Sequence, residues 1–215
     1  MVYQLDRILK DVRIALDQNG ANETLLSEED ESTLSLDELI RSKVLEAVDR
    51  VHSMAPYYKL ELGHNMNNGN VLFWEGNDTC GWVLLPDDFM RLVVFQMSDW
   101  ERVVYNPIYT DDPSYPIQRG RVKGLRGTAQ RPVCVIAMRP SGNVLEFYSC
   151  KSNQAEISKA VYIPYASIDE DGGVDISERC YESVVYTIGA LTLMSCGEVE
   201  KGSSLLEIAK GNIEK

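Results

Sequence analysis

One stretch of the chain has the residue types and spacing for contact with anions. No acidic side chain occurs from Pro113 to Leu145, although the chain as a whole has 33 Asp and Glu against 21 Lys and Arg and a net charge of -12. Arginine dominates this stretch, and its planar, multi-donor guanidinium suits carboxylates and phosphates. The basic residues in it are Arg119, Arg121, Lys123, Arg126, Arg131 and Arg139. Two interpretations stay open: the cations neutralise acids of the same chain, or they form an interface to an acidic neighbouring subunit or to DNA.

Carboxylates offer only weak signals for catalysis or metal binding. Asp87 and Asp88 fit acid–base or metal chemistry, but a helix-capping acid beside a solvated neighbour explains them as well. The acidic run 169–175 lacks the spacing of a twelve-residue calcium loop, which favours an ordinary turn. The five cysteines include no CxxC pair, which argues against structural zinc. We therefore expect no catalytic residue, metal or cofactor.

Composition limits the class of protein further. With 215 residues and 44% hydrophobic content, the chain is long enough for one sizeable core or for a helical body with an inserted module. A net charge of -12 disfavours general nucleic-acid binding, because most of the surface would repel phosphate. No apolar run approaches the ~20 residues of a membrane span, and the N-terminus lacks the pattern of a signal peptide. We expect a protein that assembles in the cytosol and contacts no membrane.

Helical patterns mark the N-terminal part of the chain. Apolar residues at helical spacing predict a helix over 2–17. Ser35, with Glu38 three residues later, forms a capping-box pattern that begins a second helix, and Ala55-Pro56 ends it. The acidic stretch 21–33 between the two helices is expected to be a solvated loop, with an acidic docking surface as the alternative.

Three further helices are expected. The pattern of Phe89, Leu92, Val93, Gln96 and Trp100 predicts a helix over 88–105, with Asp87 as its N-cap. The longest apolar-periodic segment predicts a helix over 176–196, which Gly197 ends. Residues 203–215 read as a short terminal helix or a tail.

Strand patterns are concentrated in the middle of the chain. Two short runs, 71–74 and 81–85, are expected to pair across a turn. Further strands are expected at 132–138, 144–150 and 159–165, the first two joined by a hairpin. These elements predict an α+β fold in which a helical bundle carries a small inserted antiparallel β-module. The bundle would comprise 1–105 and 176–215, and the β-rich insertion 106–175.

This order of elements resembles that of the head-to-tail adaptor proteins of tailed bacteriophages, also called head-completion or ring proteins. The most family-like piece is Leu85-Pro86-Asp87-Asp88-Phe89-Met90-Arg91-Leu92 entering the expected third helix, with Trp100 farther along it. The chain looks most similar to adaptors of short-tailed phages, such as the portal-proximal ring protein of crAss-like phages. The resemblance covers nearly the whole chain as an order of elements.

The resemblance implies a structural virion protein at the portal–tail junction, assembled in the cytoplasm of the host bacterium. About twelve copies would form a ring that extends the DNA channel. Its partners would be the portal protein, neighbouring copies, a downstream tail or second ring protein and, transiently, the phage DNA. Portal contact would fall by position on the C-terminal segment 203–215, with Leu205, Leu206 and Ile208 as apolar anchors that gain partners on docking. The acidic loop 23–31 and the basic stretch 119–131 would be complementary flanks of the ring subunit.

Two other classes of function compete with the adaptor. In a ligand- or carbohydrate-binding module, Trp74 and Trp82 on adjacent strands would form the platform, although buried aromatic packing explains them as well. In a cell-wall hydrolase, Asp87, Asp88 or Glu101 would supply the carboxylate.

Overall fold

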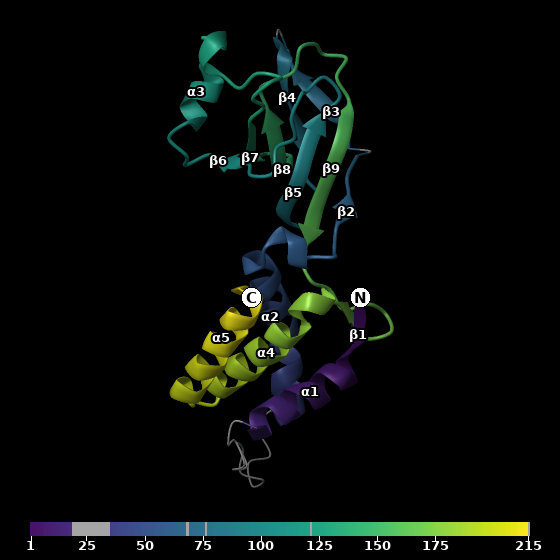
Figure 1. Cartoon of the computed structure of the whole chain (residues 1–215). Coiled ribbons are helices and arrows are strands. Elements are labelled where there is room, and N and C mark those ends of the chain that lie inside the picture. Colours follow the sequence, from purple (N-terminus) through teal and green to yellow (C-terminus); the bar gives the residue numbers. More distant parts are fainter. Residues whose placement is uncertain (19–34, 68, 76, 121, 215) are drawn as a thin grey trace. The chain divides into compact units, whose positions relative to one another are not determined.

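The computed structural model describes residues 1–18, 35–67, 69–75, 77–120 and 122–214, and of residues 77, 78 and 123 only the backbone (Figure 1). The acidic loop 21–33 of the sequence analysis lies outside these residues. The chain divides into two compact units. The helical unit comprises Met1–Leu62 and Tyr165–Lys215, and the β unit comprises Gly63–Pro164. The helical unit is thus built from both ends of the chain.

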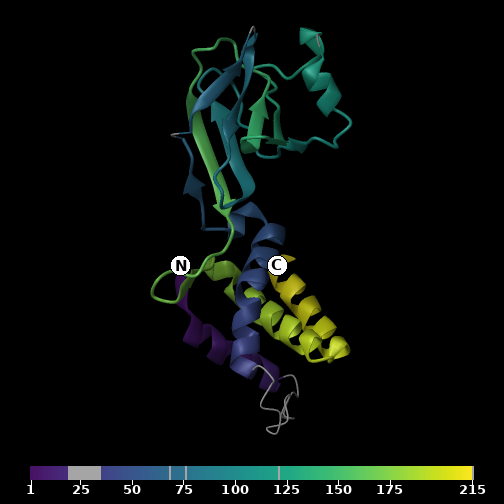
Figure 2. The ribbon, with the colours of Figure 1, turned by 180° about the vertical axis from the view of Figure 1, so that it is seen from behind.

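Helices make up most of the described part of the helical unit, as Figures 1 and 2 show. The pattern that predicted helices at both ends of the chain is confirmed for these segments. A two-stranded antiparallel sheet joins the first residues of the chain to the segment before α4. The elements are β1 (Val2–Gln4), α1 (Leu5–Gln18), α2 (Leu36–Met54), a 3-10 turn η1 (Tyr57–Lys59), β10 (Gly173–Asp175), η3 (Glu178–Cys180), α4 (Tyr181–Ser195) and α5 (Val199–Glu214).

The ends of α2 and α4 follow from local chemistry. The Ser35 hydroxyl accepts a hydrogen bond from the backbone N–H of Glu38, and the Glu38 carboxylate accepts one from the backbone N–H of Ser35. This is the predicted capping box, and the hydrogen bonds that the Glu38 carboxylate accepts from the backbone N–H and the hydroxyl of Ser35 lower its pKa. Gly197 has φ +89, a left-handed conformation that glycine adopts freely, and it ends α4 as predicted.

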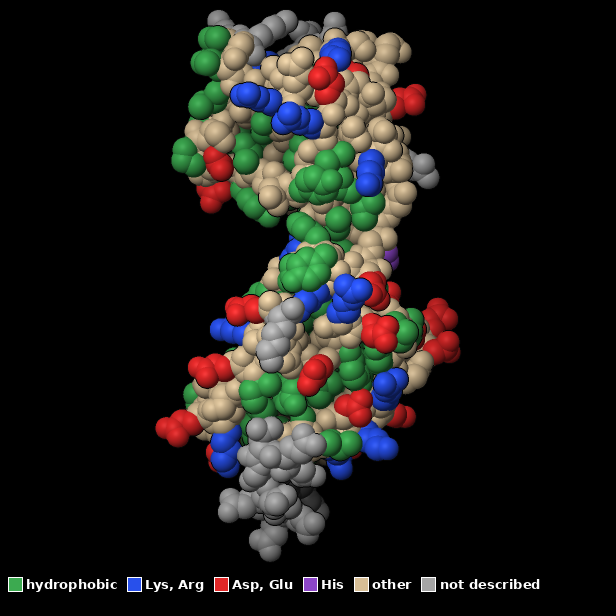
Figure 3. All heavy atoms as spheres, viewed as in Figure 1, with side chains coloured by type: hydrophobic (Ala, Val, Ile, Leu, Met, Phe, Trp, Pro, Cys, Tyr) green, Lys and Arg blue, Asp and Glu red, His purple; other side chains and the backbone are tan. Residues whose placement is uncertain are grey.

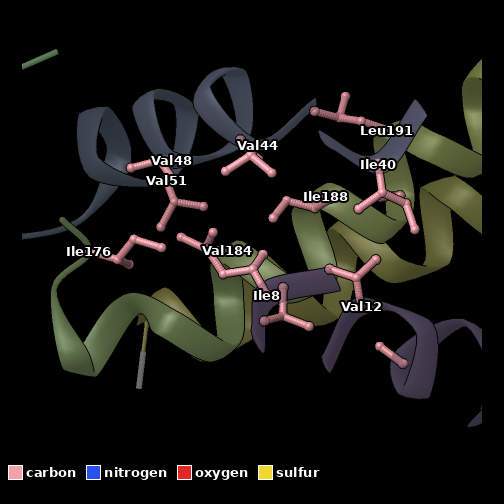
Figure 4. Close-up of a cluster of buried hydrophobic side chains, with 14 of the residues drawn as sticks. Ile8, Val12, Ile40, Val44, Val48, Val51, Ile176, Val184, Ile188 and Leu191 are labelled. Atoms are coloured by element: carbon pink, nitrogen blue, oxygen red, sulfur yellow. The ribbon is translucent and has the colours of Figure 1, made fainter. Parts of the chain in front are cut away.

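The core of the helical unit is a continuous apolar cluster around α4 (Figure 4). Helix α4 is buried on nearly every side, whereas α1, α2 and α5 each bury one face against it. Such burial removes apolar surface from water, which is the main source of the unit's stability. The labelled side chains in Figure 4 are Ile8, Val12, Ile40, Val44, Val48, Val51, Ile176, Val184, Ile188 and Leu191.

The β unit contains two sheets that share one apolar core. A five-stranded sheet has the order β3-β4-β8-β7-β6, antiparallel except for the β6–β7 pair, and a three-stranded antiparallel sheet has the order β2-β9-β5. Its elements are β2 (His64–Asn65), β3 (Val71–Trp74), β4 (Asn77–Leu84), β5 (Phe89–Met97), β6 (Ile108–Tyr109), α3 (Tyr115–Arg119), η2 (Lys123–Leu125), β7 (Cys134–Arg139), β8 (Gly142–Phe147) and β9 (Ile157–Pro164).

Several of these strands confirm the sequence patterns. Strands β3 and β4 pair where the two short runs predicted it, and β7 and β8 form the predicted hairpin. Pro116 lies in the first turn of the short helix α3. A proline is tolerated there, because its missing N–H would have no partner within the helix.

The expected helix over 88–105 is wrong, and the expected fold class is wrong with it. Residues Phe89–Met97 form the strand β5, and Asp87 lies in a turn closed by the hydrogen bond from Phe89 N to Pro86 O (3.1 Å) rather than at a helix N-cap. The described residues contain five α-helices and ten strands in three sheets. The chain is therefore a mixed α and β protein with a large β unit, 63–164, in place of a helical bundle with a small insertion at 106–175.

Candidate functional site

The two units differ sharply in charge. The helical unit carries 23 Asp and Glu against 11 Lys and Arg in the sequence, a formal charge of -12, whereas the β unit carries ten of each. The whole net charge of the chain thus belongs to the helical unit. On the face in Figure 3, acidic and basic side chains are both spread over the helical unit, and the β unit shows Lys and Arg side chains near α3 as well as acidic side chains. The basic stretch of the sequence belongs to the unit without net charge.

Helix α3 and the residues after it are held on the five-stranded sheet by polar contacts. The Tyr115 hydroxyl donates to Glu146 Oε2 on β8 (3.4 Å). Gln118 is buried, and its Oε1 accepts a hydrogen bond from the backbone N–H of Gly127 (2.8 Å). The Arg126 Nε donates to the carbonyl oxygen of Gly120 (2.6 Å), the residue that follows α3. These side-chain contacts hold α3 and the residues after it in place.

The outer side of this segment combines apolar and cationic groups. Ile117 is 45% exposed, Val122 61% and Leu125 67%, and Arg119 between them is exposed too. The guanidinium of Arg119 lies over the Tyr115 ring, 5.8 Å from its centroid. We call Ile117, Arg119, Val122 and Leu125 the basic projection. Exposed apolar groups beside arginine are typical of protein interfaces.

The two interpretations of the basic stretch apply to different residues. Arg139 neutralises an acid of its own unit, because its guanidinium pairs with the buried Glu146. Arg119, Arg126 and Arg131 form no ion pair with any acid that the structure describes. The interface interpretation therefore concerns Arg119 and the exposed Arg131. Arg121 lies outside the described residues, as does the Lys123 side chain.

The C-terminal residues proposed as docking anchors differ in their surroundings. Leu205 on α5 is 1% exposed and lies in the core of the helical unit, so it already has partners. The expectation that it gains partners only on docking is wrong, because α5 packs on α4. Leu206 is half-buried against the same core, and Ile208 is 41% exposed. Ile208 is thus the most accessible of the three.

The carboxylates considered for catalysis have separate partners. Asp88 accepts a hydrogen bond from the Tyr162 hydroxyl (2.9 Å) and lies 3.7 Å from Nδ1 of His64. Burial and the hydrogen bond to Asp88 raise the pKa of Tyr162 to about 12. Glu101 pairs with Lys151 (3.5 Å). Asp88 and Glu101 thus interact with different side chains and do not form a carboxylate pair with one another.

The acidic run 169–175 forms a turn. Asp169 Oδ1 accepts hydrogen bonds from the backbone N–H groups of Asp171 (3.0 Å) and Gly173 (2.5 Å), and the Asp175 carboxylate pairs with the N-terminal amine (2.7 Å). No group of three or more His, Cys, Asp and Glu side chains suited to a metal ion occurs among the described residues. All five cysteines are free, and four of them are buried.

The two tryptophans of the ligand-platform interpretation lie on one face of the five-stranded sheet. Trp74 packs edge-on against Tyr148, with ring centroids 5.3 Å apart, and the Arg139 guanidinium lies 5.4 Å from its ring centroid. Trp82 is half-buried and stands opposite Leu72 on β3 and Glu146 on β8. Trp74 therefore takes part in packing around the Arg139–Glu146 pair.

Sequence reasoning missed a groove between α1 and α4. It has a volume of about 220 Å³ and is lined by Asp11, Ile14, Ala15, Tyr181, Glu182, Val185 and Tyr186. Ile14 is 44% exposed although it is a large apolar side chain. The sequence contained a signal for this groove, because Ile14 is an apolar residue outside the apolar stripe with which α1 packs into the core. Figure 3 shows hydrophobic side chains exposed over α4 and α1, with acidic side chains among them.

A second cavity, of about 420 Å³, lies within the β unit. Its lining combines four amide side chains with one carboxylate and four apolar side chains, one of them aromatic. Its lining residues are Asn67, Gly69, Asn70, Val71, Phe73, Asn153, Gln154, Ala155, Glu156 and Ile157. Neither Trp74 nor Trp82 belongs to it.

Comparison with known proteins adds no family assignment. No protein-family model matches the chain, and no curated protein sequence matches it significantly. None of the helices in the described ranges is long and apolar enough to cross a membrane.

Proposed function

We propose that the chain is a structural adaptor of the head-to-tail connector of a tailed bacteriophage. Copies of it would form a ring between the portal and the tail and extend the DNA channel. The observation that carries the proposal is the charge division between the units, -12 in the helical unit and zero in the β unit. A ring subunit needs two unlike surfaces, since heterologous contacts close a ring. The basic projection and the acidic helical unit are such a pair.

The order of elements supports the same proposal. Helices from both ends of the chain form one unit, and the β unit is inserted between α2 and α4. This split helical body is the part of the resemblance to phage adaptors that remains, because the piece Leu85–Leu92 leads into strand β5 and not into a helix. An acidic surface also suits a DNA channel, because it repels phosphate and DNA passes without sticking.

The test is native mass spectrometry of the full chain mixed with the portal ring encoded by the same genome. A discrete complex with about one copy per portal subunit is the expected result for a ring matched to the portal. An Ile208→Asp variant serves as a probe of the portal contact, because Ile208 is exposed and its replacement spares the core. Absence of any complex at micromolar concentrations contradicts the adaptor function.

A second candidate function, glycan binding by the β unit, is favoured by the amide-lined cavity. Asn and Gln side chains both donate and accept hydrogen bonds, as sugar hydroxyls do, and the 420 Å³ volume falls within the range of roughly 300–1,000 Å³ for ligand pockets. Screening the full chain and a Gln154→Ala variant on a glycan array tests it. Binding that the variant loses supports this candidate, and no binding by either protein removes it.

A further inference from the structure

We infer that the basic projection of one copy docks into the α1–α4 groove of a neighbouring copy. The inference rests on the proposed function and specifies its subunit contact. The occupant of the groove is a second copy of this chain. The groove belongs to the helical unit and the projection to the β unit, so the contact joins unlike surfaces.

The groove has an apolar floor and an acidic rim. Val185 is 7% exposed at the floor, and Ile14 and the half-buried Tyr186 form apolar walls. Its volume of about 220 Å³ lies below the roughly 300–1,000 Å³ of small-molecule pockets, and it suits a few protruding side chains. A groove of this kind is filled by apolar anchors of a protein partner.

Two carboxylates set the charge preference of this groove. Asp11 accepts a hydrogen bond from the Tyr181 hydroxyl (2.6 Å) and lies 3.8 Å from Arg7 Nε, so it is partly neutralised. Glu182 is exposed and pairs with no described base. The groove therefore favours a partner that brings apolar side chains together with a cation next to Glu182.

The basic projection supplies both the apolar side chains and the cation. Leu125 and Val122 are among the most exposed apolar side chains of the chain, and Arg119 has no acid partner among the described residues. Arginine beside apolar anchors forms multi-donor contacts to carboxylates that a lysine does not match. Internal contacts of Gln118 and Arg126 hold the segment in place, so little conformational entropy is lost on docking.

Long-range electrostatics favour the same orientation. Two helical units, each with a formal charge of -12, repel one another, whereas the neutral β unit with its basic projection does not oppose approach to a helical unit. Copies therefore associate β unit to helical unit. A heterologous contact of this kind repeats from copy to copy and closes into a ring or continues as a filament.

Photo-cross-linking tests the contact directly. The full chain carries Leu125→p-benzoylphenylalanine and is mixed with copies labelled with ¹⁵N, alone and on the portal ring. The expected result is cross-links between light and heavy chains that map to α1 and α4 around Ile14 and Tyr186. Cross-links confined to one chain, or to another surface of the neighbour, overturn the inference.

Charge and apolar variants provide the second measurement. Arg119→Glu is expected to lower the association constant between copies at least about tenfold, and Glu182→Arg introduced into the same chain is expected to restore it. Leu125→Asp is expected to abolish the contact, whereas Met138→Asp, at an 83% exposed position of the β unit, is its matched control and leaves it unchanged. Equal losses in both Asp variants, or no rescue by Glu182→Arg, overturn the inference.

Mixing with the portal separates this inference from the adaptor function. If Leu125→Asp copies still bind the portal but no longer occupy its sites cooperatively, the result supports both the subunit contact and the adaptor function. Complete cooperative rings of Leu125→Asp copies overturn the contact and leave the adaptor function standing. Wild-type copies that cross-link through the groove but ignore the portal support the contact and contradict the adaptor function. If wild-type copies neither cross-link through the groove nor bind the portal, both the subunit contact and the adaptor function are overturned.

Discussion

Arg139 on β7 and Glu146 on β8 form an ion pair on one face of the five-stranded sheet, with Arg139 Nε 3.0 Å from Glu146 Oε1. Glu146 is 1% exposed, and its other carboxylate oxygen accepts hydrogen bonds from the hydroxyls of Tyr148 and Tyr115. Since Tyr115 begins α3, this buried carboxylate connects the segment of the basic projection to the sheet. Glu146 is the first acid after the long acid-free stretch of the sequence.

Glu146→Ala is expected to destabilise the β unit by about 3–5 kcal/mol, because it leaves the Arg139 charge and two hydroxyls without their acceptor. Glu146→Gln keeps an acceptor oxygen and is expected to cost less. Tryptophan fluorescence during urea unfolding measures the effect, since all three tryptophans, Trp74, Trp82 and Trp100, lie in the β unit. An alanine variant as stable as the wild type contradicts the structural role of this pair.

Two glycines of α5 are expected to respond in opposite directions to alanine. A Cβ at Gly202 would lie 2.9 Å from the carbonyl oxygen of Ala190 on α4, so Gly202→Ala is expected to destabilise the helical unit by about 1–3 kcal/mol. A Cβ at Gly211 meets nothing within 4 Å, and Gly211→Ala is expected to stabilise it by about 0.5–1 kcal/mol. Urea unfolding followed by circular dichroism at 222 nm compares them. The same sign for both variants is incompatible with the close approach of α4 and α5.

Substitutions at the buried Leu205 and the exposed Ile208 distinguish an effect on core packing from an effect on docking. Leu205→Ala removes a side chain from the core and is expected to cost about 2–5 kcal/mol of stability. Ile208→Ala changes an exposed position and is expected to stay within about 0.5 kcal/mol, yet to weaken binding to the portal. Thermal unfolding and portal titration measured on the same samples distinguish the two effects. A large stability loss in Ile208→Ala contradicts this assignment.

Asp49 is expected to make the helical unit less stable as pH rises. Its carboxylate accepts a hydrogen bond from Ala166 N (2.7 Å), but burial outweighs this bond and raises its pKa above the ordinary value of 3.8. Between that value and the higher pKa of the folded state, the folded chain binds more protons than the unfolded chain, so stability falls with rising pH.

Asp49→Asn removes this titration and keeps an acceptor oxygen. The stability of the variant relative to the wild type is therefore expected to increase as pH rises above 3.8 and to level off once Asp49 is ionised in the folded chain as well. Urea unfolding at 222 nm at a series of pH values provides the measurement. A difference that does not change with pH shows that Asp49 is not the group responsible.

Sequence patterns located most elements because their signals are local. The capping box of Ser35 and Glu38, the glycine that ends α4 and the hairpin of β7 and β8 depend on neighbouring residues alone. Such local signals depend little on the tertiary packing of the rest of the chain.

Strand β5 escaped detection because its burial does not alternate strictly. Its pairing with β9 shifts register between Phe89 and Arg91, between Leu92 and Val94, and between Gln96 and Met97. Each irregularity offsets the inward and outward positions, so the apolar residues imitate helical spacing. Nine residues rich in β-branched and aromatic side chains were the opposing signal.

The sequence indicated the basic projection but not the groove between α1 and α4. The acid-free stretch marked the basic projection in the sequence, but which cations are free depends on Glu146 and Gly120, with which Arg139 and Arg126 interact. The groove depends on how α1 packs on α4. No local pattern reports this packing, apart from the position of Ile14 outside the apolar stripe.

The adaptor function is tested most directly by cryo-electron microscopy of the portal–tail junction in virions from the same genome. The expected result is density between portal and tail that accommodates one helical unit and one β unit per copy in a closed ring. Virions in which this chain is absent from the junction, and undetected by mass spectrometry of purified particles, would contradict it.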